Sequence, residues 1–128
     1  MKESEDFRVL LVYPNLAMML IPPISIALFT RILKDQNYVL DLFDSTHYLS
    51  AETSSPENRV KYLQAREFHS EQLGVDIGFD LLGDFRKKVE EFQPDFMIYS
   101  VVEDSWLQCS RMLTAIQDLK IPHIVGGV

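Results

Sequence analysis

The residues of this chain that point to binding chemistry stand at the ends of apolar runs. Gly126 and Gly127 directly follow the run 121–125, and Ser100 and Asp44 close two earlier runs. A strand that runs into two glycines lets its backbone come close to a flat ligand, because glycine tolerates positive φ and has no Cβ to block the approach. The sequence therefore predicts a ligand-binding site where its strands end.

The single cysteine indicates a structural role. Cys109 has no second cysteine for an internal disulfide, and one thiolate is too few for a zinc or iron–sulfur site. It stands among Met112, Leu113 and Ile116, a pattern that is typical of a buried core residue.

Composition and charge narrow the class of protein. The 128 residues are 47% apolar and 24% charged, which suits one compact domain with a real core. Nineteen acidic and 12 basic residues give a formal charge of −7. Because this charge repels phosphates and anionic lipids, we expect neither a nucleic-acid nor a membrane partner.

The sequence also predicts a cytoplasmic location. Its longest apolar stretch, 16–33, is broken by Pro22 and Pro23 and carries Arg31, so it cannot cross a bilayer as one helix. The first six residues include three acidic side chains, and no apolar run resembling a signal peptide precedes the first expected strand.

Strands and helices are expected to alternate along the chain. The expected elements are strand 8–13, helix 24–34, strand 38–43, helix 81–92, strand 96–100, helix 104–120 and a strand from 121 into the glycines. This alternation predicts a doubly wound α/β domain, flavodoxin-like (Rossmann-like), with a parallel sheet in the order 2-1-3-4.

Apolar periodicity marks one face on each expected helix. Ile24, Ala27, Leu28 and Ile32 share a face of the first helix. On the second helix, the stripe comprises Leu81 or Leu82, Phe85, Val89 and Phe92. On the third helix, it comprises Met112, Leu113, Ile116 and Leu119.

Two parts of the chain depart from the regular pattern. Residues from about 45 to 80 are interpreted as an insertion with a helix over 60–73, which either extends the fold or shapes a ligand surface. The last strand runs into the glycines with one residue left, so residues 1–128 are interpreted as a domain truncated after its fourth strand. An uncovered fourth strand is expected to associate through its edge.

Ligands of doubly wound domains bind beyond the carboxyl ends of the strands, and three common ligand classes can be tested there. A dinucleotide needs a glycine-rich turn after the first strand, and 14–19 has no glycine. A phosphoacceptor domain needs acidic residues where this chain has Tyr13 and Ser100. A flavodoxin needs a hydroxyl-rich loop after the first strand, but the loop here is apolar.

The remaining pattern resembles a known family. Pro22 and Pro23 open the first helix, an aspartate ends the second strand, Ser100 ends the third, and paired glycines end the fourth. This order is similar to that of the cobalamin-binding domain at the front of cobalamin-dependent radical S-adenosylmethionine enzymes. The resemblance covers residues 7–44 and 84–128 and leaves the insertion unmatched.

The resemblance implies roles for particular residues. Ser100 takes the place of the serine that approaches the nucleotide tail of the cofactor, and Val101 and Val102 follow in the same loop. Gly126 and Gly127 match the glycines against which the tail packs. The alternatives are a loop hydrogen bond for the serine and a tight turn for the glycines.

The loop after the first strand departs from the wider cobalamin group. Where that group carries Asp-x-His-x-x-Gly, this chain begins with Asn15 and Leu16, so cobalamin without a histidine lower ligand is implied. Leu16, with the apolar residues Met18, Met19 and Leu20, either faces the corrin ring or fills the core. The three histidines, His47, His69 and His123, are poorly placed as ligands.

The first turn of the expected third helix carries an aromatic and an acidic residue. Trp106 either stacks at the mouth of the site or lies half-buried on the helix. Asp104 is expected to cap the helix rather than to perform acid–base chemistry.

The resemblance implies a cobalamin-binding module that is not catalytic alone. The parent would be a radical enzyme that transfers a methyl group or rearranges a substrate. S-adenosylmethionine and an iron–sulfur cluster would bind a partner domain in the same parent chain, because a cluster needs several cysteines and this sequence has one. The competing hypothesis is a flavodoxin-like interaction or scaffold domain that has lost corrinoid binding.

Overall fold

The computed structural model describes residues 2–17, 23–49, 72 and 74–127. Four parallel strands form one sheet in the order β2-β1-β3-β4, as the sequence predicts. The strands are β1 (Arg8–Tyr13), β2 (Val39–Asp44), β3 (Phe96–Val101) and β4 (His123–Gly127). With helices between the strands, this is a doubly wound, flavodoxin-like α/β arrangement.

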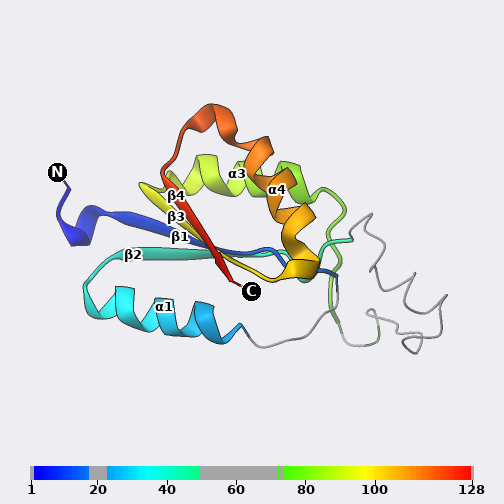
Figure 1. Cartoon of the computed structure of the whole chain (residues 1–128), viewed down its shortest axis with the longest axis horizontal. Coiled ribbons are helices and arrows are strands. Elements are labelled where there is room, and N and C mark those ends of the chain that lie inside the picture. The colour runs from blue at the N-terminus through cyan, green and yellow to red at the C-terminus, as the bar shows by residue number, and fades with distance from the viewer. Residues whose placement is uncertain (1, 18–22, 50–71, 73, 128) are drawn as a thin grey trace.

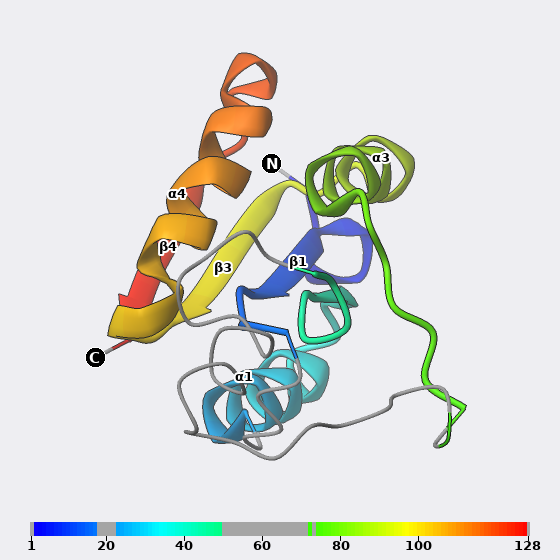
Figure 2. The ribbon, with the colours of Figure 1, turned by 90° about the vertical axis from the view of Figure 1, so that its right-hand side faces the viewer.

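Helices cover the sheet unequally. Three helices are described: α1 (Ile24–Asp35), α3 (Leu81–Phe92) and α4 (Trp106–Ala115). The short 3-10 turns are Ser4–Asp6, Glu103–Ser105 and Gln117–Leu119. Helices α3 and α4 lie on one face of the sheet and α1 lies on the other (Figure 1), and the sheet is seen between them in Figure 2. No helix among the described residues is long and apolar enough to span a membrane.

The central strand β1 is buried on both faces, which explains its continuous apolar sequence. Leu10 and Val12 face the larger core beneath α3 and α4. Val9, Leu11 and Tyr13 face the smaller core beneath α1. Burial of each such aliphatic side chain stabilises the fold by about 1.5–3 kcal/mol.

Helices α3 and α4 pack with the stripes that periodicity predicts. Phe85 and Val89 of α3 are fully buried, and so are Cys109 and Met112 of α4. The α3 helix begins where the Asp80 carboxylate accepts a hydrogen bond from the Gly83 amide at 3.0 Å. The predicted core position of Cys109 is confirmed.

Helix α1 packs with a different face from the one that periodicity favours. Ile26 is buried, and Leu33 packs beside it against β1. Ile24, Leu28 and Ile32 are instead 79%, 57% and 50% exposed. Because this helix is apolar on more than one side, the 3.6-residue period could not decide which stripe packs on the sheet.

The two ends of the 45–80 region meet beside β2. Tyr48 and Gly78 form an isolated bridge, and the Leu49 amide donates to the Gly78 carbonyl at 3.0 Å. A Cβ on Gly78 would lie 2.5 Å from the Tyr48 ring, so the close approach requires glycine. The helix predicted over 60–73 falls almost entirely outside the described residues.

Candidate functional site

The carboxyl ends of the four strands meet at one edge of the sheet, where doubly wound domains bind ligands. The β1–β2 half of this edge carries Asn15 and Leu16, and the β3–β4 half carries Ser100 to Val102 with the two glycines. The two halves differ in how much of their surface the chain itself covers.

A polar network closes the β1–β2 half. The buried Ser45 hydroxyl accepts hydrogen bonds from the Asn15 amide at 2.7 Å and from Gln108 Nε2 at 2.6 Å. It donates in turn to the Asn15 carbonyl at 2.8 Å, which also accepts from Gln108 Nε2 at 2.7 Å. Gln108 belongs to α4, so this network fixes the helix to the ends of β1 and β2.

The Asn15 side chain extends the same network. Its Nδ2 donates to the Thr46 hydroxyl at 2.9 Å, and that hydroxyl donates to the Asp44 carboxylate at 2.5 Å. Leu16 is fully buried, and Asn15 is 3% exposed. Neither side chain therefore offers surface to a ligand in this structure, and Leu16 takes the core-filling role. Residues 18–20 lie outside the described part of the chain.

In the β3–β4 half, the predicted site residues divide between the two faces of the sheet. Ser100 is in register with Gly126, and Val101 with Gly127. The Ser100 hydroxyl lies 2.5 Å from the Ser25 hydroxyl of α1, so this residue faces the α1 side. Val101 packs in the core beneath α3 and α4. Since side chains alternate along a strand, Gly126 belongs to the α1 side and Gly127 to the α4 side.

The fold gives a structural reason for glycine at position 127 but not at position 126. Gly127 has φ of +147°, and a Cβ there would lie 1.6 Å from the Val101 carbonyl oxygen. Gly126 lies outside the left-handed region, and a Cβ on it would meet no atom of the described residues within 4 Å. The fold thus requires glycine at 127 but leaves room for a side chain at 126, so positive φ is confirmed at only one of the pair.

Among the described residues, none covers the sheet face around Gly126 beside α1. On β4, Ile124 is 56% exposed. The exposed α1 residues Ile24 and Leu28 flank Ser25, whose hydroxyl contacts Ser100. This surface, which we call the α1-side face, combines apolar groups with two hydroxyls and an unfilled position at Gly126.

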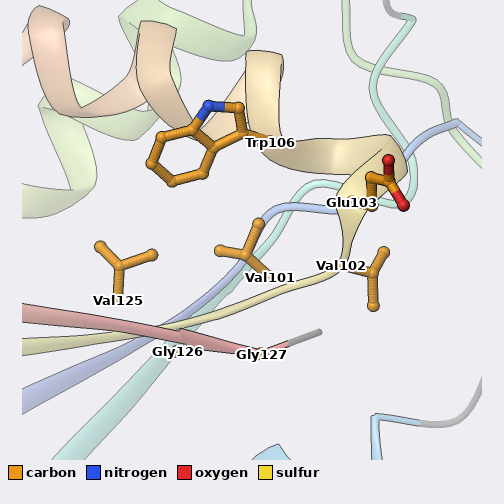
Figure 3. A pocket seen from close by; sticks show the side chains of 7 residues that line it. All are labelled: Val101, Val102, Glu103, Trp106, Val125, Gly126 and Gly127. Carbon is orange, nitrogen blue, oxygen red and sulfur yellow. The ribbon is translucent and has the colours of Figure 1, made fainter.

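A hollow of about 380 Å³ lies on the opposite side of the same strand ends. Its walls are mainly aliphatic and aromatic, and Figure 3 shows the Trp106 indole above Val101 and Val125. Glu103 lines one end, with its carboxylate turned away from the indole (Figure 3). Trp106 is 54% exposed, so it is half-buried and also stands at the mouth of a hollow.

The turn before α4 is held by Ser105. Its hydroxyl accepts from the Val102 amide at 3.3 Å and donates to the Val102 carbonyl at 3.1 Å. The capping role predicted for Asp104 is therefore wrong: the serine one residue later reaches these backbone groups.

The ionisable side chains that the structure describes form no metal centre. Among the described residues, no three His, Cys, Asp or Glu side chains come together as metal ligands. His123 Nδ1 lies 3.1 Å from the Ile121 carbonyl, and His69 is not described. Burial raises the pKa of the Cys109 thiol to about 11, so this group is an unreactive thiol at neutral pH.

Comparison of the chain with protein-family models, curated proteins and solved structures finds no match.

Proposed function

We propose that this chain is the cobalamin-binding module of a larger cobalamin-dependent radical S-adenosylmethionine enzyme, and that it is not catalytic alone. The nucleotide tail of the cofactor would lie on the α1-side face, against Ser100 and Gly126. The proposal rests on the order of motifs in the sequence and on the state of this face.

The supporting observation is the unfilled space at Gly126. Glycine inside a strand costs about 0.5–1 kcal/mol relative to alanine, and neither φ nor crowding requires it here. The missing side chain leaves the backbone accessible beside the Ser100 hydroxyl, with which Gly126 is in register. A flat group could approach the sheet at this position.

The residues present suit the chemistry of a nucleotide tail. Ile124 and Leu28 offer exposed apolar surface for a planar base. One hydroxyl of the Ser25–Ser100 pair donates to the other, which leaves one O–H group to donate to a sugar or phosphate oxygen of the tail. When bound, the cobalt of cobalamin supplies a carrier for a methyl group. No histidine of the β1–α1 loop is proposed as its ligand.

The rest of the proposal concerns the parent enzyme. A radical S-adenosylmethionine domain of the same chain would be the partner and would hold the iron–sulfur cluster, for which one buried cysteine is insufficient. We also propose a cytoplasmic location, where reducing conditions suit a single free thiol.

A second candidate is an interaction domain without corrinoid. It is favoured by the exposed apolar residues of the α1-side face, because a surface of this kind also fits a protein partner. In that case, Gly126 would have no ligand to accommodate.

The test compares two corrinoids on the same protein. Hydroxocobalamin and cobinamide, which lacks the nucleotide tail, are each titrated against the chain and then desalted. We expect cobalamin to be retained and cobinamide to be lost. The visible spectrum of bound cobalamin should shift toward that of cobinamide, because the tail has left the cobalt.

Variants locate the binding surface. Gly126→Val should abolish retention, since its side chain would fill the space at the sheet. Thr114→Ala changes an exposed side chain of α4, on the opposite face of the sheet, so this variant should retain cobalamin. Loss of both corrinoids from the unmodified chain, or equal retention of both, would contradict the proposal.

A further inference from the structure

Alternate backbone groups of β2 face away from the rest of the sheet. Among the described residues, β2 pairs with β1 alone. The Val39 amide donates to the Phe7 carbonyl at 3.0 Å, so the backbone groups of the odd-numbered residues of β2 face β1. In a parallel ladder, alternate residues bond to opposite neighbours, and the amide and carbonyl groups of Leu40 and Leu42 therefore face outward.

The strand with this outer edge is apolar apart from one residue. Residues 38–43 comprise Asp41 and five apolar or aromatic side chains. Two of these side chains, Val39 and Leu42, are 38% and 42% exposed. A short apolar segment of low charge on an edge strand is the kind that pairs with the same segment of another chain.

The Asp41 carboxylate lies in the middle of this edge. Its Oδ1 accepts a hydrogen bond at 2.8 Å from the Leu42 amide, one of the groups that face outward. Its Oδ2 forms an ion pair with Nζ of Lys88, which belongs to α3. Both oxygens are therefore engaged, and an incoming strand would have to displace the carboxylate before it could accept from the Leu42 amide.

The ion pair also makes edge pairing costly in solvation. The Asp41 and Lys88 side chains are 38% and 31% exposed, so water still solvates both charges. A strand that pairs with β2 would remove part of this water from both groups. Charged side chains on an edge strand oppose pairing for this reason.

We propose that Asp41 is a gatekeeper residue whose carboxylate, held by Lys88, prevents β2 from pairing edge to edge with β2 of a second copy of this chain. A second copy is the partner that this edge fits, because it presents the same apolar segment and the same outward amide and carbonyl groups. Two identical edges can pair antiparallel about a two-fold axis. This inference does not depend on cobalamin binding.

The test compares the self-association of Asp41→Ala and Asp35→Ala by sedimentation over a series of protein concentrations. Both variants remove one carboxylate that forms an ion pair, but Asp35 belongs to α1 and not to the sheet. We expect Asp41→Ala to lower the dissociation constant of the dimer about tenfold, because each dimer gains hydrogen bonds from two Leu42 amides. Asp35→Ala should associate no more than the unmodified chain.

Hydrogen exchange at single amides locates the contact. In Asp41→Ala, exchange of the Leu42 amide should slow as the protein concentration rises. Asp41→Asn keeps an oxygen that can accept from this amide but has no charge for Lys88, so its dissociation constant should lie between those of Asp41→Ala and the unmodified chain. Circular dichroism checks that each variant is folded, and Asp41→Asn alone carries the comparison if Asp41→Ala is not.

Three results would overturn the proposal. The first is that the folded Asp41 variants have the same dissociation constant as the unmodified chain. The second is that they associate while exchange of the Leu42 amide stays independent of concentration. The third is that the unmodified chain already protects its Leu42 amide in a concentration-dependent way.

Discussion

The two halves of the sheet's carboxyl edge are built in opposite ways. At the ends of β1 and β2, buried polar groups satisfy one another, and Ser45 links the chain at Asn15 to Gln108 of α4. At the ends of β3 and β4, the described residues leave an uncovered face beside Gly126 and an open hollow beneath Trp106. The first half fixes the fold, and the second half offers surface for a ligand.

This contrast separates residues that look equivalent in the sequence. Asn15 and Gly126 both stand at the end of an apolar run of the sequence, yet Asn15 is enclosed and Gly126 is accessible. A strand end becomes a candidate binding position only if nearby side chains do not already use its polar groups.

The largest effect is expected from substitution of the second glycine. Gly127→Val places a Cβ against the Val101 carbonyl at a positive φ, so we expect a loss of about 3 kcal/mol or more in the free energy of unfolding. Gly126→Val should change it by no more than about 1 kcal/mol, because its Cβ meets open space. Urea denaturation measures the free energy of unfolding of both variants. Equal losses of stability would show that the two positions do not differ.

A smaller loss in the free energy of unfolding is expected from a substitution in the β1–β2 half of the edge. Ser45→Ala removes a hydroxyl that serves Asn15 and Gln108 and leaves buried polar groups unpaired, which costs about 1–3 kcal/mol. Thr114→Ala, an exposed hydroxyl on the same helix as Gln108, is the control and should lie within about 0.5 kcal/mol of the unmodified chain. If the two variants were equally stable, the network would not hold this half together.

The smallest effect is expected on the free energy of unfolding at alkaline pH. Burial raises the pKa of Cys109 from 9.0 to about 11, so the unfolded chain loses this proton first. Stability should therefore be constant below about pH 9 and fall between about pH 9 and 11. Burial also raises the pKa of Tyr99, which adds to the fall above pH 10. Urea titrations at several pH values should show a shallower fall in Cys109→Ala, and an unchanged slope would contradict the assignment.

The order of the strands and two of the three helix faces could be predicted from the sequence. Continuous apolar runs such as 8–13 identify buried parallel strands, and Phe85 and Val89 recur at a helical period with polar residues between them. Helix α1 lacks this contrast, so its packed face followed from tertiary contacts with β1 and not from its own period.

The candidate site was predictable only in part. The paired glycines predicted where β4 ends, but the need for glycine at 127 and not at 126 depends on the position of the Val101 carbonyl in a neighbouring strand. The enclosure of Asn15 depends on Ser45 and Gln108, which are 30 and 93 residues away in the chain. Local patterns carry no information about such distant partners.

Hydrogen exchange with and without cobalamin tests the central claim most directly. We predict that bound cobalamin slows exchange of amides in 24–28, 100–102 and 126–127, and leaves 13–17 and 44–46 unchanged because the polar network already encloses them. Protection confined to 13–17 and 44–46, or no protection at either half of the edge, would contradict the assignment of the β3–β4 half as the binding surface.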